Sequence, residues 1–288
     1  MTIKEILTKK NLVLSFELFP PKKEQSFAGV FEAAEKLSSL KPDFISVTCG
    51  AGGTTDGNTS EVAAKINSMG IPSLAHLTCA DNTRKSLLQK IQIMKDLGIN
   101  NVLALRGDKK TALSDFEHAS DIVPYLKQAG FCTGGACYPE GHPESPNLDA
   151  DIDKLHYKVD AGLDFLTTQM FFDNNMLYSY LYRLNSREIH LPVLAGIMPV
   201  TNASQVQKMV RLSGALVPPK LMMLCDKFSG NSGAMYQAGI SYAVDQILDL
   251  ISNGIRGIHI YTMNKANVAC DIIKNLSSIF EAAAWNFA

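Results

Sequence analysis

The sequence predicts one (β/α)₈ barrel, and two regularities of the chain support this prediction. Eight short apolar runs recur along the 288 residues, most of them about thirty residues apart, as expected for barrel strands separated by helices. Most of these runs end in a polar side chain that a buried strand tip does not need for packing. Parallel strands bring such side chains together at one rim, so the pattern indicates an active site there.

The eight predicted strands are VLSFELFP from Val13, FISVTCG from Phe44, SLAHLTC from Ser73, NVLALRGD from Asn101, CTGGACYPE from Cys132, DFLTTQMFFD from Asp164, PVLAGIMPV from Pro192 and GIHIYTMN from Gly257. The polar side chains at or near their C-terminal ends are Glu17, Thr48, His76, Asp108, Tyr138, Gln169 and Tyr261. An open, doubly wound sheet is an alternative, because apolar periodicity counts strands without showing whether they close.

Stretches of helical period separate the runs. Leu87, Ile91, Met94 and Leu97 follow one another at spacings of three and four before Gly98 ends the helix. Helices of this length allow the crossover that parallel neighbours need. The strands are therefore expected to pair in parallel.

Residues 1–288 are expected to form a single catalytic domain. The chain begins with a predicted helix that has a capping box from Thr2 to Glu5. Two additional helical patterns, Leu221 to Phe228 and Met235 to Ile251, lie before the last strand. The region from Ala215 is a candidate interface for a homo-oligomer.

Composition favours a soluble cytoplasmic enzyme. Hydrophobic residues make up 46% of the chain, charged residues 19%, and the formal net charge is -1, which gives no electrostatic reason to expect nucleic acid or an anionic membrane as partner. No signal segment or membrane span is predicted. The six cysteines suit a reducing compartment, and the odd spacing of Cys132 and Cys137 places them on opposite strand faces, so no metal site is expected.

Glu17 is the sharpest catalytic candidate, because it lies between Phe16 and Leu18 just before a Pro-Pro pair. Burial penalises a charged carboxylate, so we expect a raised pKa and a role as general acid. The alternative is a structural ion pair with a lysine or arginine of a neighbouring strand.

Three further strand-end residues are candidate ligand contacts. Asp108 follows Arg106 and Gly107, and a glycine there allows a ligand to approach the backbone; a mutual Arg106–Asp108 ion pair is the alternative. His76 within its strand is as consistent with a satisfied core histidine as with a ligand contact. Gln169 offers both a donor and an acceptor, which suits a heterocycle.

Familiar nucleotide and hydrolase motifs are missing. The stretch GAGG from Gly50 lacks the third glycine of a dinucleotide fingerprint, and no Walker lysine follows it. No G-x-S-x-G elbow or catalytic triad is visible. A dinucleotide would have to be held without a Rossmann motif.

In combination, SFELFPPK, FISVTCGAGG, AHLTC, LALRGD, ACYPEGHPES, KVDAG, TTQMFFD, GIMPV and YTMN resemble methylenetetrahydrofolate reductase of the compact bacterial type, which has the catalytic domain alone. The resemblance implies a barrel with noncovalent FAD that reduces 5,10-methylenetetrahydrofolate to 5-methyltetrahydrofolate. The electron source implied is NADH or NADPH, used in a ping-pong reaction.

The resemblance also implies roles for single residues. Glu17 matches the acid that opens the five-membered ring of the folate, and Asp108 matches an aspartate near the flavin. The positions implied to contact FAD are Thr48, His76, Leu105, Arg106, Gly107, Asp108, Ala119, Tyr138, His142, Asp151 and Lys158. The positions implied to contact the folate are Glu17, Gln169, Gln205, Met209 and Lys265.

The chain departs from the family pattern at four positions. Lys154 and Tyr157 stand where relatives carry Asn and Arg in the helix after the fifth strand, so the resemblance implies no contact of these two residues on the adenosine side of FAD. Met209 stands where a stacking phenylalanine is expected, and Lys265 replaces an arginine that meets the glutamate tail of the folate. Lysine keeps the positive charge and loses the bidentate fork.

Two alternatives remain open on the sequence. One is another flavin barrel oxidoreductase, similar to proline dehydrogenase, which would not need the buried glutamate. The other is a folate-binding subunit that receives electrons only through a partner protein. The choice between NADH and NADPH does not follow from the sequence.

Overall fold

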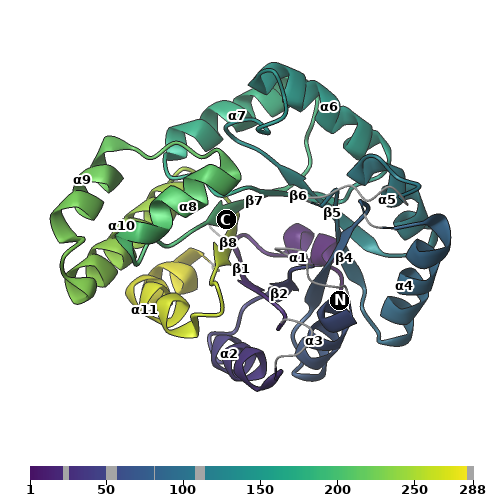
Figure 1. Ribbon diagram of the computed structural model, residues 1–288, viewed down its shortest axis with the longest axis horizontal. Coiled ribbons are helices and arrows are strands. Elements are labelled where there is room, and N and C mark those ends of the chain that lie inside the picture. The colour runs from purple at the N-terminus through teal and green to yellow at the C-terminus, as the bar shows by residue number, and fades with distance from the viewer. Residues whose placement is uncertain (22–25, 50–56, 81, 108–113, 284–288) are drawn as a thin grey trace.

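The structure is a closed barrel of eight parallel strands surrounded by helices (Figure 1). It is a computed structural model that describes residues 1–21, 26–49, 57–80, 82–107 and 114–283. Each strand pairs with the next along the chain, and β8 pairs with β1 to close the barrel. The predicted barrel is confirmed, and the open sheet is excluded.

All eight apolar runs form strands. Their bounds are β1 Val13–Leu18, β2 Phe44–Val47, β3 Ser73–Thr78, β4 Asn101–Leu105, β5 Cys132–Cys137, β6 Phe165–Thr168, β7 Val193–Ile197 and β8 Gly257–Tyr261. In the register of the sheet, Glu17 of β1 lies beside Ser46 of β2 and Tyr261 of β8. The candidate acid is therefore bordered by polar residues on both neighbouring strands.

The helices follow the predicted pattern. Their bounds are α1 Ile3–Lys9, α2 Ala28–Ser38, α3 Gly57–Ser68, α4 Arg84–Asp96, α5 Ala119–Gln128, α6 Leu148–Asp160, α7 Asn174–Ser186, α8 Ala203–Ser213, α9 Pro219–Phe228, α10 Ser232–Ser252 and α11 Ala266–Ala283. The capping box from Thr2 to Glu5 begins α1, as predicted. The two extra helical patterns form α9 and α10, which pack against each other before β8.

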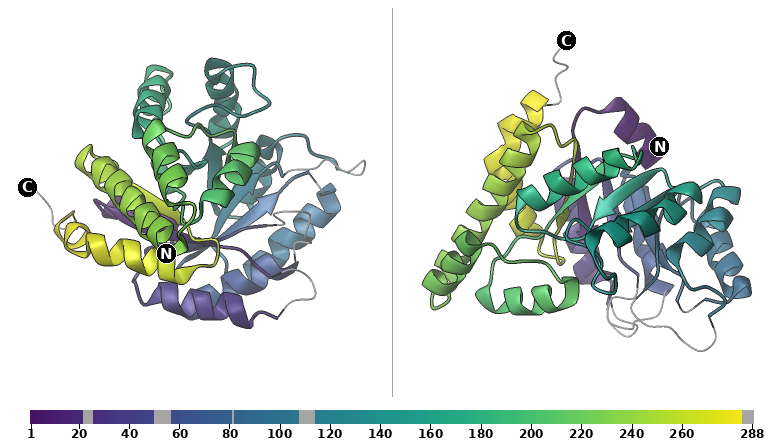
Figure 2. Two further views of the ribbon diagram at one scale, coloured as in Figure 1. Left: turned by 60° about the vertical axis from the view of Figure 1, so that its left-hand side comes forward. Right: turned by 90° about the horizontal axis from the view of Figure 1, so that it is seen from above.

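An apolar floor closes one end of the barrel. Helix α1 lies across that end (Figure 2), and its Ile3 and Ile6 pack against inward side chains such as Phe44 and Phe165. The backbone N–H of Ile3 donates to the side chain of Asn101 over 2.8 Å. This apolar layer fills the lower barrel, and in barrels of this kind ligands bind at the opposite end.

The layer above the floor is polar. On β1, Leu14 and Phe16 pack toward the helices, so the alternation of a strand turns Ser15 and Glu17 into the barrel. The same alternation places His76 of β3 inside. Buried polar side chains inside a barrel are costly unless they are paired, which marks this layer as more than a packing core.

The two neighbouring cysteines of β5 separate as the odd spacing predicted. Cys132 belongs to the apolar floor, and Cys137 belongs to the layer between strands and helices. Within the described ranges, no group of three or more His, Cys, Asp or Glu side chains could hold a metal ion. None of the described helices is long and apolar enough to cross a membrane.

His76 is held neutral by burial. Only 6% of the residue is exposed, and desolvation lowers its pKa to about 4, although the nearby Glu17 opposes the shift. In the unfolded chain a histidine binds its proton near pH 6.5, so between these values the unfolded state holds more protons. The free energy of unfolding therefore decreases as the pH falls through this window.

We predict that His76→Gln makes stability less dependent on pH. Between pH 8 and pH 5 the wild-type protein should lose about 2 kcal/mol of unfolding free energy through His76, a loss that the glutamine variant lacks. Urea unfolding at the two pH values measures the difference. The exposed His190, changed to glutamine, is the matched control; an equal pH dependence in wild type and His76→Gln would contradict the buried neutral state.

Candidate functional site

The loop after β8 fixes the position of Glu17. The hydroxyl of Thr262 donates to the carbonyl oxygen of Glu17 over 2.6 Å. The side chain of Asn264 donates to the carbonyl of Phe19 and accepts from its N–H, both at 2.8 Å. Met263 and Asn264 adopt positive φ angles of 52° and 59°, which turn the loop back over β1. The strand end that carries Glu17 is thus held by a turn from the neighbouring strand.

The carboxyl group of Glu17 lies between two histidines. Its Oε2 atom is 3.7 Å from Nε2 of His76 and 3.7 Å from Nε2 of His259. The side chain of Glu17 is 8% exposed. Among the described residues no lysine or arginine pairs with it, so the alternative of an ion pair with those residue types is not found.

His259 is a site residue that the sequence analysis missed. Its Nδ1 is 2.8 Å from the hydroxyl of Ser15, and its ring stacks on Phe44 with centroids 6.2 Å apart. Tyr261 meets the same ring edge-on at 5.2 Å. The signal was present in GIHIY, where His259 and Tyr261 are two residues apart and must share the inner face of β8.

Tyr261 is oriented across the neighbouring strand. Its hydroxyl donates to the carbonyl of Thr168 over 2.5 Å. A Cβ atom on Gly196 would lie 2.7 Å from the tyrosine ring and 2.6 Å from that carbonyl. Glycine is therefore required on β7 for the ring to reach its acceptor.

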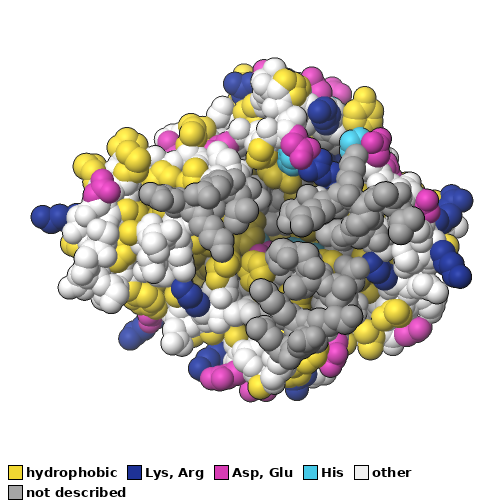
Figure 3. Space-filling model, viewed as in Figure 1, with side chains coloured by type: hydrophobic (Ala, Val, Ile, Leu, Met, Phe, Trp, Pro, Cys, Tyr) yellow, Lys and Arg dark blue, Asp and Glu magenta, His cyan; other side chains and the backbone are white. Residues whose placement is uncertain are grey.

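A second group of predicted residues gathers at the ends of β4 and β5. The rings of Tyr138 and His142 meet edge-on at 4.7 Å. Burial and the nearby Arg106 guanidinium lower the pKa of His142. In Figure 3, basic, acidic and His side chains gather in the upper part of this face. A neutral imidazole, a phenol and a guanidinium together suit a ligand with both rings and phosphates.

Helix α6 supplies the cationic and acidic members of this group. Lys158 donates to the carbonyl of Ala136 over 2.6 Å, and burial lowers its pKa. Asp151, two turns earlier, accepts from Ser145 over 2.9 Å. Tyr157 is 70% exposed, so the helix directs this departure from the family pattern toward solvent. Lys154 is exposed as well.

Arg106 forms a bidentate ion pair with Glu144 after β5, with nitrogen to oxygen distances of 2.5 and 2.8 Å. This contact raises the pKa of the guanidinium. Gly107 has a φ of 92°, and a Cβ there would lie 3.1 Å from Thr78. Asp108, and with it the alternative Arg106–Asp108 pair, lies outside the described residues, as does GAGG from Gly50.

Two buried polar atoms fit a bound group at this rim. The hydroxyl of Thr48 and Nε2 of His76 have no hydrogen-bond partner among the described residues. Buried polar atoms in native proteins are nearly always paired, so these atoms suit contacts to a ligand. Leu105 is the last residue of β4, and Ala119 is the first residue of α5. Their predicted contacts to FAD stay predictions.

The predicted substrate residues of α8 and the β8 loop come together. Gln205, Met209, Tyr261 and Lys265 line one small crevice of about 10 Å³. Gln169 follows β6, and its side-chain oxygen accepts from the N–H of Met170 over 2.8 Å. Gln169 is not among the described residues that line this crevice, and its predicted role stays a prediction.

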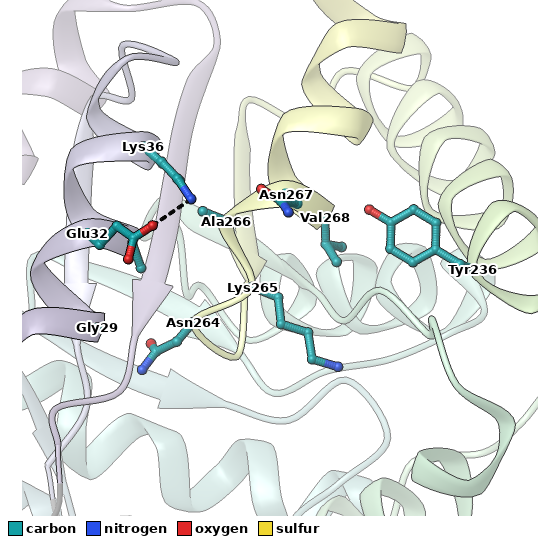
Figure 4. Close-up of a pocket in the computed structure, with 10 residues that line it drawn as sticks. Gly29, Glu32, Lys36, Tyr236, Asn264, Lys265, Ala266, Asn267 and Val268 are labelled. Carbon is teal, nitrogen blue, oxygen red and sulfur yellow. Dashed lines mark hydrogen bonds and ion pairs between the residues drawn. The ribbon is translucent and has the colours of Figure 1, made fainter. Parts of the chain in front are cut away.

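A larger pocket of about 410 Å³ lies between α2, α10 and the start of α11 (Figure 4). Lys265 lines both this pocket and the small crevice. Lys36 also lines it and pairs with Glu32 over 2.8 Å. Of the predicted site residues that the structure describes, only Lys265 lines this pocket, so volume alone does not locate the candidate active site.

Comparisons with known proteins identify the family to which this barrel is similar. Residues 2–277 match the family model of methylenetetrahydrofolate reductase. The 5,10-methylenetetrahydrofolate reductase of Escherichia coli (strain K12) is 34% identical over 266 residues, which cover 91% of this chain and 90% of that protein. The enzyme of the same name from Pectobacterium carotovorum subsp. carotovorum is 33% identical over 267 residues, covering 91% and 89%.

One plant relative and one solved structure extend the comparison. Methylenetetrahydrofolate reductase (NADH) 1 of Arabidopsis thaliana is 30% identical over 302 residues, which cover 97% of this chain and 51% of that protein. An uncharacterized protein from Clostridium thermocellum that binds two copies of 5-methyl-5,6,7,8-tetrahydrofolic acid matches the fold with a TM-score of 0.69 and 15% identity, covering 96% of this chain and 100% of that one. With its family match over nearly the whole length, the chain belongs to the methylenetetrahydrofolate reductase family.

Proposed function

We propose that this protein is a flavin-dependent enzyme that reduces 5,10-methylenetetrahydrofolate to 5-methyltetrahydrofolate with electrons from NADH or NADPH, and so supplies methyl groups for one-carbon metabolism and methionine synthesis. The observation that carries the proposal is the buried Glu17 carboxyl between two histidines at the mouth of a barrel of this family. A carboxyl group in this position can exchange one proton with a substrate while bulk water is excluded.

Glu17 acts as the general acid in this proposal. Its carboxyl gives a proton to the nitrogen that leaves when the five-membered ring of the folate opens, and the bond electrons remain on that nitrogen. The methylene carbon is then held as a cationic iminium by the other nitrogen. Asp108, which matches a family aspartate, would stabilise that positive charge. Glu17 finishes as a carboxylate and must recover its proton before the next turnover.

FAD would be held by residues on or just after β2 to β5 and by residues of α6. The unpaired hydroxyl of Thr48 and Nε2 of His76 suit its ring system. Arg106, Tyr138 and Lys158 suit its polar and phosphate groups without a glycine fingerprint. When bound, this cofactor would supply the two-electron chemistry that amino-acid side chains lack.

The folate and the nicotinamide would use one site in turn. Gln205, Met209 and Lys265 line a common crevice, so a bound donor would occupy the space that the folate needs. Such overlap predicts ping-pong kinetics. Met209 offers a soft, flexible surface to a flat ring, and Lys265 offers one positive charge to the carboxylates of the folate tail.

Three broader expectations belong to the same proposal. Cys132, Cys137, Cys225 and Cys270 form no disulfide in the described part of the chain, which supports a reducing compartment such as the cytoplasm. We further propose a homo-oligomer, with exposed Leu216, Met222 and Met223 near α9 as candidate contacts. A partner subunit for electron delivery is the remaining alternative for the donor.

We predict that the purified protein has the absorption spectrum of an oxidised flavin, and that anaerobic NADH or NADPH bleaches it. Subsequent addition of methylenetetrahydrofolate should restore the oxidised spectrum, because the two half-reactions share one cofactor. Stopped-flow absorbance measures both steps. A protein that stays colourless in excess FAD contradicts the proposal, whereas bound flavin that neither nucleotide bleaches indicates a partner subunit.

Glu17→Gln should separate the two half-reactions. The amide cannot donate a carboxyl proton, so reoxidation by folate should slow by about 10²- to 10⁴-fold while reduction by the nucleotide persists. Single-turnover absorbance of each half-reaction gives the two rates. Unimpaired folate reduction in this variant would remove Glu17 from the acid role.

Removing the Arg106 side chain should weaken flavin binding. A charge-assisted hydrogen bond contributes about 1.5 to 3 kcal/mol, so Arg106→Ala should raise the Kd for FAD by about 10- to 100-fold. Titration of flavin-free protein with FAD, followed by fluorescence, measures the change. Arg183→Ala is the matched control, because Arg183 forms a surface ion pair with Asp149 on α6; equal Kd values in the two variants would contradict the assignment.

A further inference from the structure

We propose that His259, held by Ser15, is a positioning residue for Glu17 that can bind both protonation states of its carboxyl group. The inference rests on the proposed function, in which Glu17 alternates between acid and carboxylate. It assigns a task to two buried residues of the inner barrel, neither of which is among the FAD or folate positions predicted from the sequence. Ser15 is fully buried, and His259 is 1% exposed.

The ring of His259 has little freedom to move. It stacks on Phe44 at an interplanar angle of 13° and meets Tyr261 at 85°. These two aromatic rings therefore restrict rotation of the imidazole. Its Nδ1 lies 2.8 Å from the Ser15 hydroxyl. Its opposite nitrogen, Nε2, then points to Oε2 of Glu17 at 3.7 Å. A small rotation of the carboxyl group would close this gap to a hydrogen bond of about 3.0 Å.

Ser15 can hydrogen-bond to either neutral tautomer of the His259 ring, because its hydroxyl both donates and accepts. When the Ser15 hydroxyl donates to Nδ1 of His259, the ring proton is on Nε2 and can be donated to a Glu17 carboxylate. When Nδ1 carries the proton, it donates to Ser15, whose hydroxyl can turn to the carbonyl of Ile258 at 3.4 Å. Nε2 is then an acceptor for the protonated carboxyl. The ring is neutral in both tautomers, because one nitrogen carries a proton and the other accepts a hydrogen bond in each.

The other groups that face Glu17 do not duplicate this function. His76 approaches the same oxygen at 3.7 Å, but its Nδ1 has no serine at hydrogen-bond distance among the described residues. The hydroxyl of Tyr261 donates to the carbonyl of Thr168. From β2, the Ser46 hydroxyl is buried and lacks a described partner. Of these groups, only His259 has a hydrogen bond at the ring nitrogen that points away from Glu17. This bond to Ser15 fixes the orientation of the ring, and it can form in either tautomer.

Two substitutions of His259 distinguish positioning from packing. In His259→Gln the amide reaches the place of Nε2 and can both donate and accept, whereas in His259→Asn it reaches only the place of Nδ1. We expect His259→Asn to slow folate reduction by about 10- to 100-fold with nucleotide oxidation unchanged, and His259→Gln to recover most of that rate. Ser15→Ala should fall between wild type and His259→Asn.

Single-turnover absorbance of both half-reactions, repeated across pH, provides the measurement. Ser73→Ala, which removes another buried strand hydroxyl outside this group, is the control and should match the wild type. Equal folate rates for His259→Asn and wild type overturn the inference, as does an equal loss in the asparagine and glutamine variants or a parallel loss in both half-reactions. If Glu17→Gln itself reduces folate normally, the proposed function fails instead.

Discussion

The carboxyl group of Glu17 lies inside the barrel with 8% of its side chain exposed, and the fold has to compensate for its lost hydration. A lysine or arginine would hold it permanently as a carboxylate, which suits a structural ion pair and not an acid. The barrel instead presents two imidazoles at 3.7 Å, one of them kept neutral by burial. Neutral donors and acceptors allow the carboxyl to change its protonation state without leaving an unpaired charge behind.

The positions of Glu17 and the two histidines depend on packing elsewhere in the barrel. The apolar floor beneath them is packed by α1, so the polar layer lies on the side of the barrel away from that helix. Gly196 leaves room for the ring of Tyr261, and Thr262 fixes the backbone of Glu17 from the next strand. Closure of the sheet between β8 and β1 is therefore what brings the acid and His259 together. An open sheet would leave them on opposite edges.

Much of this architecture could be predicted from sequence, since strand periodicity is a local property. All eight strands, the extra helices and the inward direction of Glu17 and His76 follow from spacing alone. His259 was missed because the candidates were chosen at the C-terminal ends of the predicted strands. On β8 that criterion selects Tyr261, which lies two residues after His259. The pair of Arg106 and Glu144 was missed for another reason: their partnership joins two loops 38 residues apart, and no pattern along the chain encodes which cation meets which anion.

The separation of tasks within the rim follows from the same geometry. The acid and its histidines arise from β1, β3 and β8, whereas the basic and aromatic cluster arises from β4, β5 and α6. His76 belongs to β3, between the strands that carry the two groups, and its Nε2 lies 3.7 Å from Oε2 of Glu17. A protonated His76 would bring a buried positive charge next to the acid and favour its carboxylate form. Burial of His76, which lowers its pKa, therefore keeps a positive charge away from Glu17, and it does so at a cost in stability as the pH falls.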